Sequence, residues 1–148
     1  MAHAVAHSPS SNPLPTAGGR NAAPRRGLHV LRGVDPHTSK AAALAVFRKF
    51  AERSPLPLGV LRAQLIPDAT WKRAEDVLGP SASQTFARLV HALEFATRTW
   101  QNEADAIDWL LGPHMELGGA TPYSLLRTES GGRAVEYVMA ALEYGFPV

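Results

Sequence analysis

The strongest folding signal in this chain is a run of apolar residues at helical spacing, between about residue 83 and residue 100. Its members recur every three or four positions, which places them on one face of an α-helix. They are Phe86, Leu89, Val90, Leu93, Thr97 and Trp100. At 1.5 Å per residue this helix would be about 27 Å long. No segment of the chain alternates apolar and polar residues as a half-buried strand does. We therefore predict an all-α fold with this helix as the spine of its core.

Prolines, glycines and capping residues divide the remaining sequence into shorter helices. The predicted helices cover residues 36–53, 58–66, 68–78, 81–100 or 83–100, 103–111, 122–126 and 130–144. Asp35 and Asp68 are the expected N-caps of the first and third helices, and Asn102 and Thr121 those of two later ones. Gly145 is the expected stop of the last helix. Its inward residues are expected to be Val135, Val138, Met139 and Leu142.

The formal net charge of +2 is unevenly distributed along the 148 residues. Residues 1–34 contain four Arg and no acidic residue, and residues 35–73 contain seven basic against three acidic residues. Residues 74–148 contain four basic and ten acidic residues. The chain thus has a basic front, residues 1–73, and an acidic back, residues 74–148.

Residues 1–34 consist mainly of Ala, Ser, Pro, Gly and Arg, with almost no large apolar residue before Leu28. Such a segment buries too little apolar surface to offset its conformational entropy, so we expect a disordered tail. The composition also loosely resembles an organelle transit peptide, although Pro9, Pro13, Pro15 and Pro24 interrupt any amphipathic helix.

Several classes of protein are excluded by what the sequence lacks. The longest apolar run covers residues 41–47, far short of the roughly 20 residues of a membrane-spanning helix. With no Cys there is no disulfide and no thiol nucleophile, which fits the cytoplasm. His114 and Glu116 match the H-x-E part of a zinc deaminase, whose P-C-x-x-C partner needs Cys. We expect a cytoplasmic protein without membrane partner, metal, cofactor or catalytic residues.

Two short predicted helices, 58–66 and 68–78, are separated by a tight break, as in a helix-turn-helix. The second would present Thr70, Lys72 and Arg73 outward, where they can contact DNA, with Trp71 facing the core. Glu75 and Asp76 follow at once and would repel phosphate. The basic residues therefore make operator DNA an expected partner, while the two acidic residues weaken the signal.

The C-terminal block carries a more specific pattern. Its residues are Trp109, Leu110, Gly118, Gly119, Thr121, Pro122, Leu125, Leu126, Gly132 and Val135, before a final helix that ends in Gly145. This block resembles the Xre/MbcA/ParS toxin-binding domain, whose pattern reads roughly A-x-x-W-L, a Pro, L-x-G-x-T-P-x-x-L-L-x-T-x-x-G, then a Val and a closing helix. The resemblance is strong over about residues 104–148. It divides the chain into a tail (1–34), a helix-turn-helix-like region (35–100) and a toxin-binding domain (101–148).

Each motif residue also has a structural role that is independent of the resemblance. Glycines allow left-handed turns or close helix approach, Thr-Pro starts a helix, and apolar residues fill the core. We interpret the motif as mainly structural. The resemblance implies a cognate RES-domain toxin that consumes NAD and is blocked sterically, with the antitoxin C-terminus at its active-site entrance. The implied toxin-contacting residues are Tyr144, Gly145, Phe146, Pro147 and Val148. Alternatively, Phe146 folds back onto the last helix.

The resemblance further implies a homodimer within a toxin-antitoxin complex that represses its own operon. Two other hypotheses remain open from the sequence. One is a stand-alone helix-turn-helix regulator without a toxin. The other is a ParS-like adaptor or polar-localisation protein, since part of the resembling family acts in that way.

Overall fold

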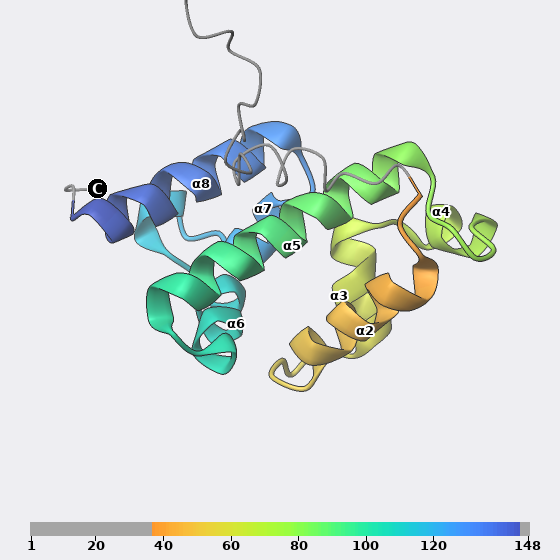
Figure 1. The fold of residues 1–148 in the computed structure, drawn as a ribbon, viewed down its shortest axis with the longest axis horizontal. Helices are drawn as coiled ribbons and strands as arrows, with labels where there is room; N and C mark the ends of the chain where they lie inside the picture. Colours follow the sequence, from red (N-terminus) through yellow and green to blue (C-terminus); the bar gives the residue numbers. More distant parts are fainter. Residues whose placement is uncertain (1–36, 146–148) are drawn as a thin grey trace, which may run out of the picture.

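The computed structural model describes residues 37–145, and within this range it is built from helices without a β-strand (Figure 1). The elements are α2 (Lys40–Ala51), α3 (Leu58–Leu65), α4 (Asp68–Arg73), α5 (Pro80–Trp100), α6 (Glu103–Leu111), the 3-10 helix η1 (Met115–Leu117), α7 (Pro122–Leu125) and α8 (Glu129–Tyr144). The all-α prediction is confirmed. The predicted tail, residues 1–34, lies outside the described residues, as do Asp35 and the chain tip 146–148.

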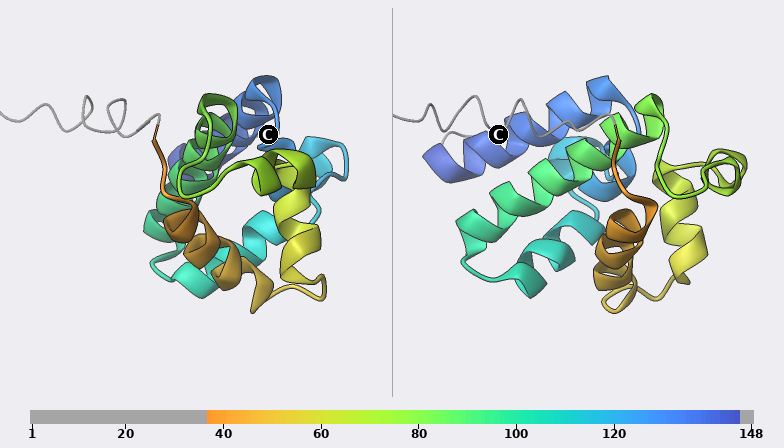
Figure 2. Two further views of the ribbon diagram at one scale, coloured as in Figure 1. Left: turned by 90° about the vertical axis from the view of Figure 1, so that its right-hand side faces the viewer. Right: turned by 45° about the vertical axis from the view of Figure 1, so that its right-hand side comes forward.

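Helix α5 is the longest element and runs through the middle of the molecule, with α8 along one side and α6 packed back against it (Figures 1 and 2). The predicted spine is thus present. It begins at Pro80, one to three residues earlier than predicted, because Gly79 is the N-cap and the proline takes the first turn. Phe86, Leu89 and Leu93 are buried on its inner face.

The predicted start of the first helix is wrong. Helix α2 begins at Lys40 and is capped by Ser39, whose hydroxyl accepts from the Ala42 amide at 3.3 Å. The preceding residues are not helical because they pair with a later segment. The Leu78 amide donates to the Thr38 carbonyl at 2.9 Å, and the Lys40 amide donates to the Asp76 carbonyl at 2.9 Å.

This pairing also explains why α4 is shorter than predicted. The helix ends at Arg73, and Ala74 is extended, with ψ of 126°. The ammonium of Lys40 donates to the Ala74 carbonyl at 2.8 Å, which holds the extended segment against α2. The expected cap is wrong as well: Pro67 is the N-cap of α4, and the Asp68 carboxylate forms an ion pair with Arg62 instead.

The later helix ends agree closely with the sequence predictions. Asn102 caps α6 by accepting from the Asp105 amide at 3.1 Å, and Thr121 caps α7 in the same way from the Ser124 amide. Helix α8 begins one residue before the predicted start, with Thr128 as its cap, and ends at Gly145. The prediction that Leu142 faces the core is wrong, because 46% of this residue is exposed. It lies in the last turn, which extends to the edge of the molecule (Figure 1).

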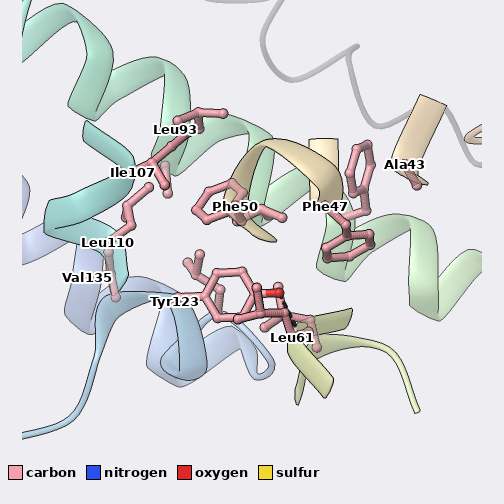
Figure 3. Packing of buried hydrophobic residues seen from close by; sticks show 14 of the residues in the cluster. Ala43, Phe47, Phe50, Leu61, Leu93, Ile107, Leu110, Tyr123 and Val135 are labelled. Carbon is pink, nitrogen blue, oxygen red and sulfur yellow. Dashed lines mark hydrogen bonds between the residues drawn. The ribbon is translucent and has the colours of Figure 1, made fainter. Parts of the chain in front are cut away.

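The buried apolar residues form one core that includes side chains from α2, α3, α5, α6, α7 and α8. Figure 3 shows Phe50 and Tyr123 near its centre, with their ring centroids 5.2 Å apart. Phe47 lies beside them and is 6.0 Å from Phe86 of α5. The front helices and the C-terminal helices therefore share a single hydrophobic core.

Candidate partner-binding site

An aromatic stack fixes the beginning of the C-terminal motif. Trp109 of α6 is half-buried between Trp100, at 5.1 Å, and His114, at 4.7 Å between ring centroids. The Nε2 atom of His114 lies 2.8 Å from the Trp109 carbonyl. A carbonyl only accepts, so Nε2 carries the proton of this hydrogen bond. Leu110, the next residue, is buried in the core.

The motif glycines that follow occupy left-handed backbone. Gly118 has φ of +68° and Gly119 has φ of +83°, a region that residues with a β-carbon rarely adopt. The turn is closed by the His114 carbonyl, which accepts from the Gly119 amide at 2.9 Å. This geometry returns the chain to Thr121 and starts α7 beneath α8.

The junction of α7 and α8 is the tightest point of the motif. A β-carbon on Gly131 would lie 2.0 Å from the Leu125 carbonyl oxygen, and one on Gly132 would lie 2.9 Å from Cδ of Arg88. The sequence analysis singled out Gly132 and missed Gly131. The glycine pair three and four residues after the Thr128 cap was the available signal, but the obstructing carbonyl is visible only in the structure.

Arg88 of α5 also contacts this junction of α7 and α8. Its guanidinium donates to the carbonyl of Leu126 at 2.8 Å and to that of Arg127 at 2.9 Å. Burial lowers the pKa of Arg88, because desolvation disfavours the charged form. Arg88 therefore acts as a clamp that joins the end of α7 to the spine helix.

The remaining motif residues also lie in the interior. Pro122, Leu126 and Val135 are buried, and Leu125 is half-buried against the core. These side chains have little surface to offer to a partner. Direct contacts of this region with another protein must come from its exposed side chains.

The C-terminal end of α8 has such an exposed side chain. Tyr144 is 69% exposed, and Gly145 ends the helix in left-handed backbone with φ of +69°. Phe146, Pro147 and Val148, which complete the predicted toxin-contacting set, lie outside the described residues. Two turns earlier on the same helix, Tyr137 is 68% exposed. The sequence analysis missed Tyr137, although its seven-residue spacing from Tyr144 was a usable signal.

The predicted DNA-contacting residues lie on α4, a helix of six residues. Lys72 and Arg73 are exposed at its C-terminal end and Thr70 is half-buried. Trp71 faces inward as expected and meets Phe47 edge-on at 6.2 Å. Thr70 and Arg73 line an open hollow of about 530 Å³ that Glu75 and Asp76 line as well, so two carboxylates face the same space as the arginine.

Part of the basic front is neutralised within the fold. Lys49 and Arg53 at the end of α2 pair with Glu103 and Asp108 of α6, at 3.1 Å and 2.6 Å. Arg62 pairs with Asp68. Arg53 holds Asp108 with two hydrogen bonds, and these hydrogen bonds lower the pKa of Asp108 below its ordinary value. The positive charge of residues 35–73 is thus partly a structural link to the acidic back.

Residues 37–145 contain neither a metal-binding cluster nor a membrane-spanning helix. No three His, Asp or Glu side chains of this range are grouped so that they would hold a metal ion. No helix in the same range is both long enough and apolar enough to cross a membrane.

Residues 95–145 match the family model described as the antitoxin Xre/MbcA/ParS C-terminal toxin-binding domain. The match begins within α5 and ends at the glycine that stops α8. It covers about a third of the chain, and it confirms the resemblance that the motif predicted. This segment is therefore an Xre/MbcA/ParS-type antitoxin C-terminal domain. No curated protein matches the chain.

Proposed function

We propose that this chain is an antitoxin that binds a RES-type, NAD-consuming toxin and blocks it by steric occlusion. The observation that carries the proposal is the family match over residues 95–145, a domain described as toxin-binding. The exposure of Tyr144 in the last turn of α8 supports it, because this side chain has surface to offer to a partner. The chain performs no turnover in this mechanism.

In this mechanism the segment from Tyr144 to Val148 enters the toxin's active-site entrance. Phe146, Pro147 and Val148 are apolar, so their burial in a partner removes apolar surface from water. The acidic charge of residues 74–148 suits a pocket that binds the phosphates of NAD. NAD is then excluded by occupancy and not by any chemical step of the antitoxin.

Deletion of residues 146–148 tests this occlusion. The variant keeps Gly145 and the whole described core, so its thermal unfolding should match that of the full chain. Added to a RES protein encoded beside this chain, it should fail to stop NAD consumption, whereas the full chain stops it. Deletion of residues 1–34 is the matched control and should retain full inhibition. Complete inhibition by the chain lacking residues 146–148 would contradict occlusion by the tip.

DNA binding is a second candidate function, supported by the adjacent short helices α3 and α4 and by the exposure of Lys72 and Arg73. We propose that the form that binds DNA is a cytoplasmic homodimer within a toxin-antitoxin complex, and that this complex represses its own operon. Replacing both residues by Ala should weaken binding to the promoter, and the salt slope should fall by roughly 0.9 for each lost phosphate contact. A wild-type complex with no salt-sensitive promoter binding would contradict repression.

The same experiments distinguish the other two hypotheses. Promoter binding without any toxin partner would indicate a stand-alone regulator. If the chain binds neither a toxin nor the promoter, an adaptor of the ParS type is favoured.

A further inference from the structure

The outer face of α8 carries two large aromatic side chains in one column. Tyr137 and Tyr144 are separated by seven residues, two helical turns, so they lie on the same side of the helix. They are 68% and 69% exposed. The opposite side of α8 presents Val135 and Met139 to the core. The tyrosines therefore lie on the side of α8 away from the core. Helix α8 itself runs along the edge of the fold (Figures 1 and 2).

This concentration of exposed apolar surface is unusual within the described residues. Seven large hydrophobic side chains of residues 37–145 are exposed, and three of them are on α8: Tyr137, Leu142 and Tyr144. Single exposed apolar residues need no explanation, but exposed apolar side chains that adjoin one another mark an interaction surface. Tyr137 and Tyr144 share one side of α8, whereas Leu142 lies on a different side of the helix. Tyrosine in particular is enriched at protein interfaces and among the residues that dominate binding energy.

A column of glutamates runs beside the tyrosines. Glu129, Glu136 and Glu143 are also seven residues apart, and all three are exposed. The first is neutralised by Arg133 at 2.5 Å. Glu136 has His91 at 3.8 Å, a contact that is ionic only when the histidine is protonated. The column thus places negative charge next to the aromatic stripe, most of all at Glu136 and Glu143.

We propose that this face of α8, defined by Glu136, Tyr137, Glu143 and Tyr144, is the docking surface for the toxin. It binds an apolar area of the toxin that is bordered by Lys or Arg side chains. This inference rests on the proposed function and adds to it a surface on α8 that shares only Tyr144 with the segment proposed to enter the toxin. The docking surface ends next to Gly145, the last of the described residues.

The charge pattern argues against a second copy of this chain as the occupant. Two α8 helices packed antiparallel through their tyrosine columns would bring the two glutamate columns against each other, which is repulsive. A parallel pair would place each glutamate against Ala134 or Ala141 of the other copy, the residues at the complementary heptad positions. Neither arrangement gives the glutamates a basic partner, whereas a Lys- or Arg-bordered toxin surface does.

The test uses the full-length chain and the purified RES-domain toxin proposed as its partner, with association and dissociation rates measured by surface plasmon resonance. Tyr137→Ala and Tyr144→Ala should each weaken binding by roughly tenfold or more, mainly through faster dissociation. The double charge reversal Glu136→Lys and Glu143→Lys should slow association and reduce its salt dependence. Val60→Ala and Glu52→Lys, exposed positions on α3 and at the end of α2, are the matched controls and should bind as wild type.

Three outcomes would overturn the inference. If the wild-type chain binds the toxin and the α8 variants bind it equally well, the docking surface is elsewhere and the proposed function stands. If the wild-type chain binds no RES protein, the proposed function fails and the inference fails with it. If sedimentation shows that the free chain is a dimer and that Tyr137→Ala dissociates it, the occupant is a second copy.

Discussion

Tyr123 of α7 donates a hydrogen bond of 2.6 Å from its buried hydroxyl to the backbone carbonyl of Leu61 in α3 (Figure 3). Tyr123 stands within the family-matched segment 95–145, whereas Leu61 lies 62 residues earlier in the chain. Burial raises the pKa of the Tyr123 hydroxyl, because the phenolate is disfavoured away from water. This contact and the adjoining Phe50 ring connect the toxin-binding segment to the front of the molecule.

Tyr123→Phe removes only the hydroxyl, so we expect the fold to persist with a lower free energy of unfolding. A buried hydrogen bond of this kind contributes about 1 kcal/mol. Urea unfolding followed by circular dichroism measures the change. Tyr137→Phe is the matched control, since its hydroxyl is on an exposed side chain, and it should shift the unfolding free energy by less than about 0.5 kcal/mol. Equal effects of the two substitutions would contradict the role of the Tyr123–Leu61 hydrogen bond.

The shared core also predicts the behaviour of fragments. An isolated segment 95–145 lacks Phe50 and Leu61, so it exposes the part of Tyr123 that these residues cover. We expect this segment to lack a cooperative thermal transition, whereas residues 37–148 should unfold in one transition near that of the full chain. Differential scanning calorimetry of both fragments gives the comparison. A cooperative transition of the short segment would show that its own contacts are sufficient.

The two glycines at the start of α8 should respond differently to alanine. Gly131→Ala meets a backbone carbonyl, which cannot move aside, so we expect severe destabilisation in any background. Gly132→Ala meets the side chain of Arg88, and overpacking of this kind costs about 1–3 kcal/mol. In an Arg88→Ala background the obstacle is gone, and alanine's better helix propensity, about 1 kcal/mol over glycine, should make Gly132→Ala neutral or stabilising. A double-mutant cycle with no coupling between Arg88 and Gly132 would contradict this packing.

The ion pair between Arg53 and Asp108 makes a pH-dependent contribution to stability. The folded-state pKa of Asp108 lies below its ordinary value of 3.8, owing to the hydrogen bonds from Arg53. The stabilisation is therefore complete above the unfolded pKa and is lost as the pH falls through the folded pKa. Asp108→Asn should lower the unfolding free energy at pH 7 and should have a smaller effect at pH 2. Asp76→Asn is the control, and a loss for Asp108→Asn that is equal at both pH values would rule out the ion pair as its cause.

Local signals account for the parts of the fold that the sequence predicted well. Asn102, Thr121 and Gly145 act on backbone groups within four residues of themselves, so the sequence alone locates these helix ends. The ends of α2 and α4 were mispredicted because they depend on pairing between residues 38–40 and 76–78. That pairing joins segments that are far apart in the chain and carries no local pattern.

In the candidate site, too, the features with a local sequence signal were predicted and those that depend on distant contacts were not. Its motif glycines and the Thr-Pro helix start were recognisable, since turns and caps require particular residue types. Gly131 was missed because the carbonyl that excludes a β-carbon belongs to another helix. Tyr137 was missed because the predicted inward residues of α8 leave it at the surface, but helical spacing alone does not separate an interface aromatic residue from an ordinary surface residue. The charge count of residues 35–73 did not show that Lys49, Arg53 and Arg62 form ion pairs within the fold, because their acidic partners are identified only by the structure.

The proposal that this chain binds and silences a toxin is decided by a single titration. The full chain is titrated into the RES-domain toxin proposed as its partner, with the heat of binding and the rate of NAD consumption followed in parallel. We expect saturable binding and a loss of NAD consumption that tracks the fraction of toxin bound. A toxin that consumes NAD at its full rate in the presence of a saturating excess of this chain would show that the chain does not silence it.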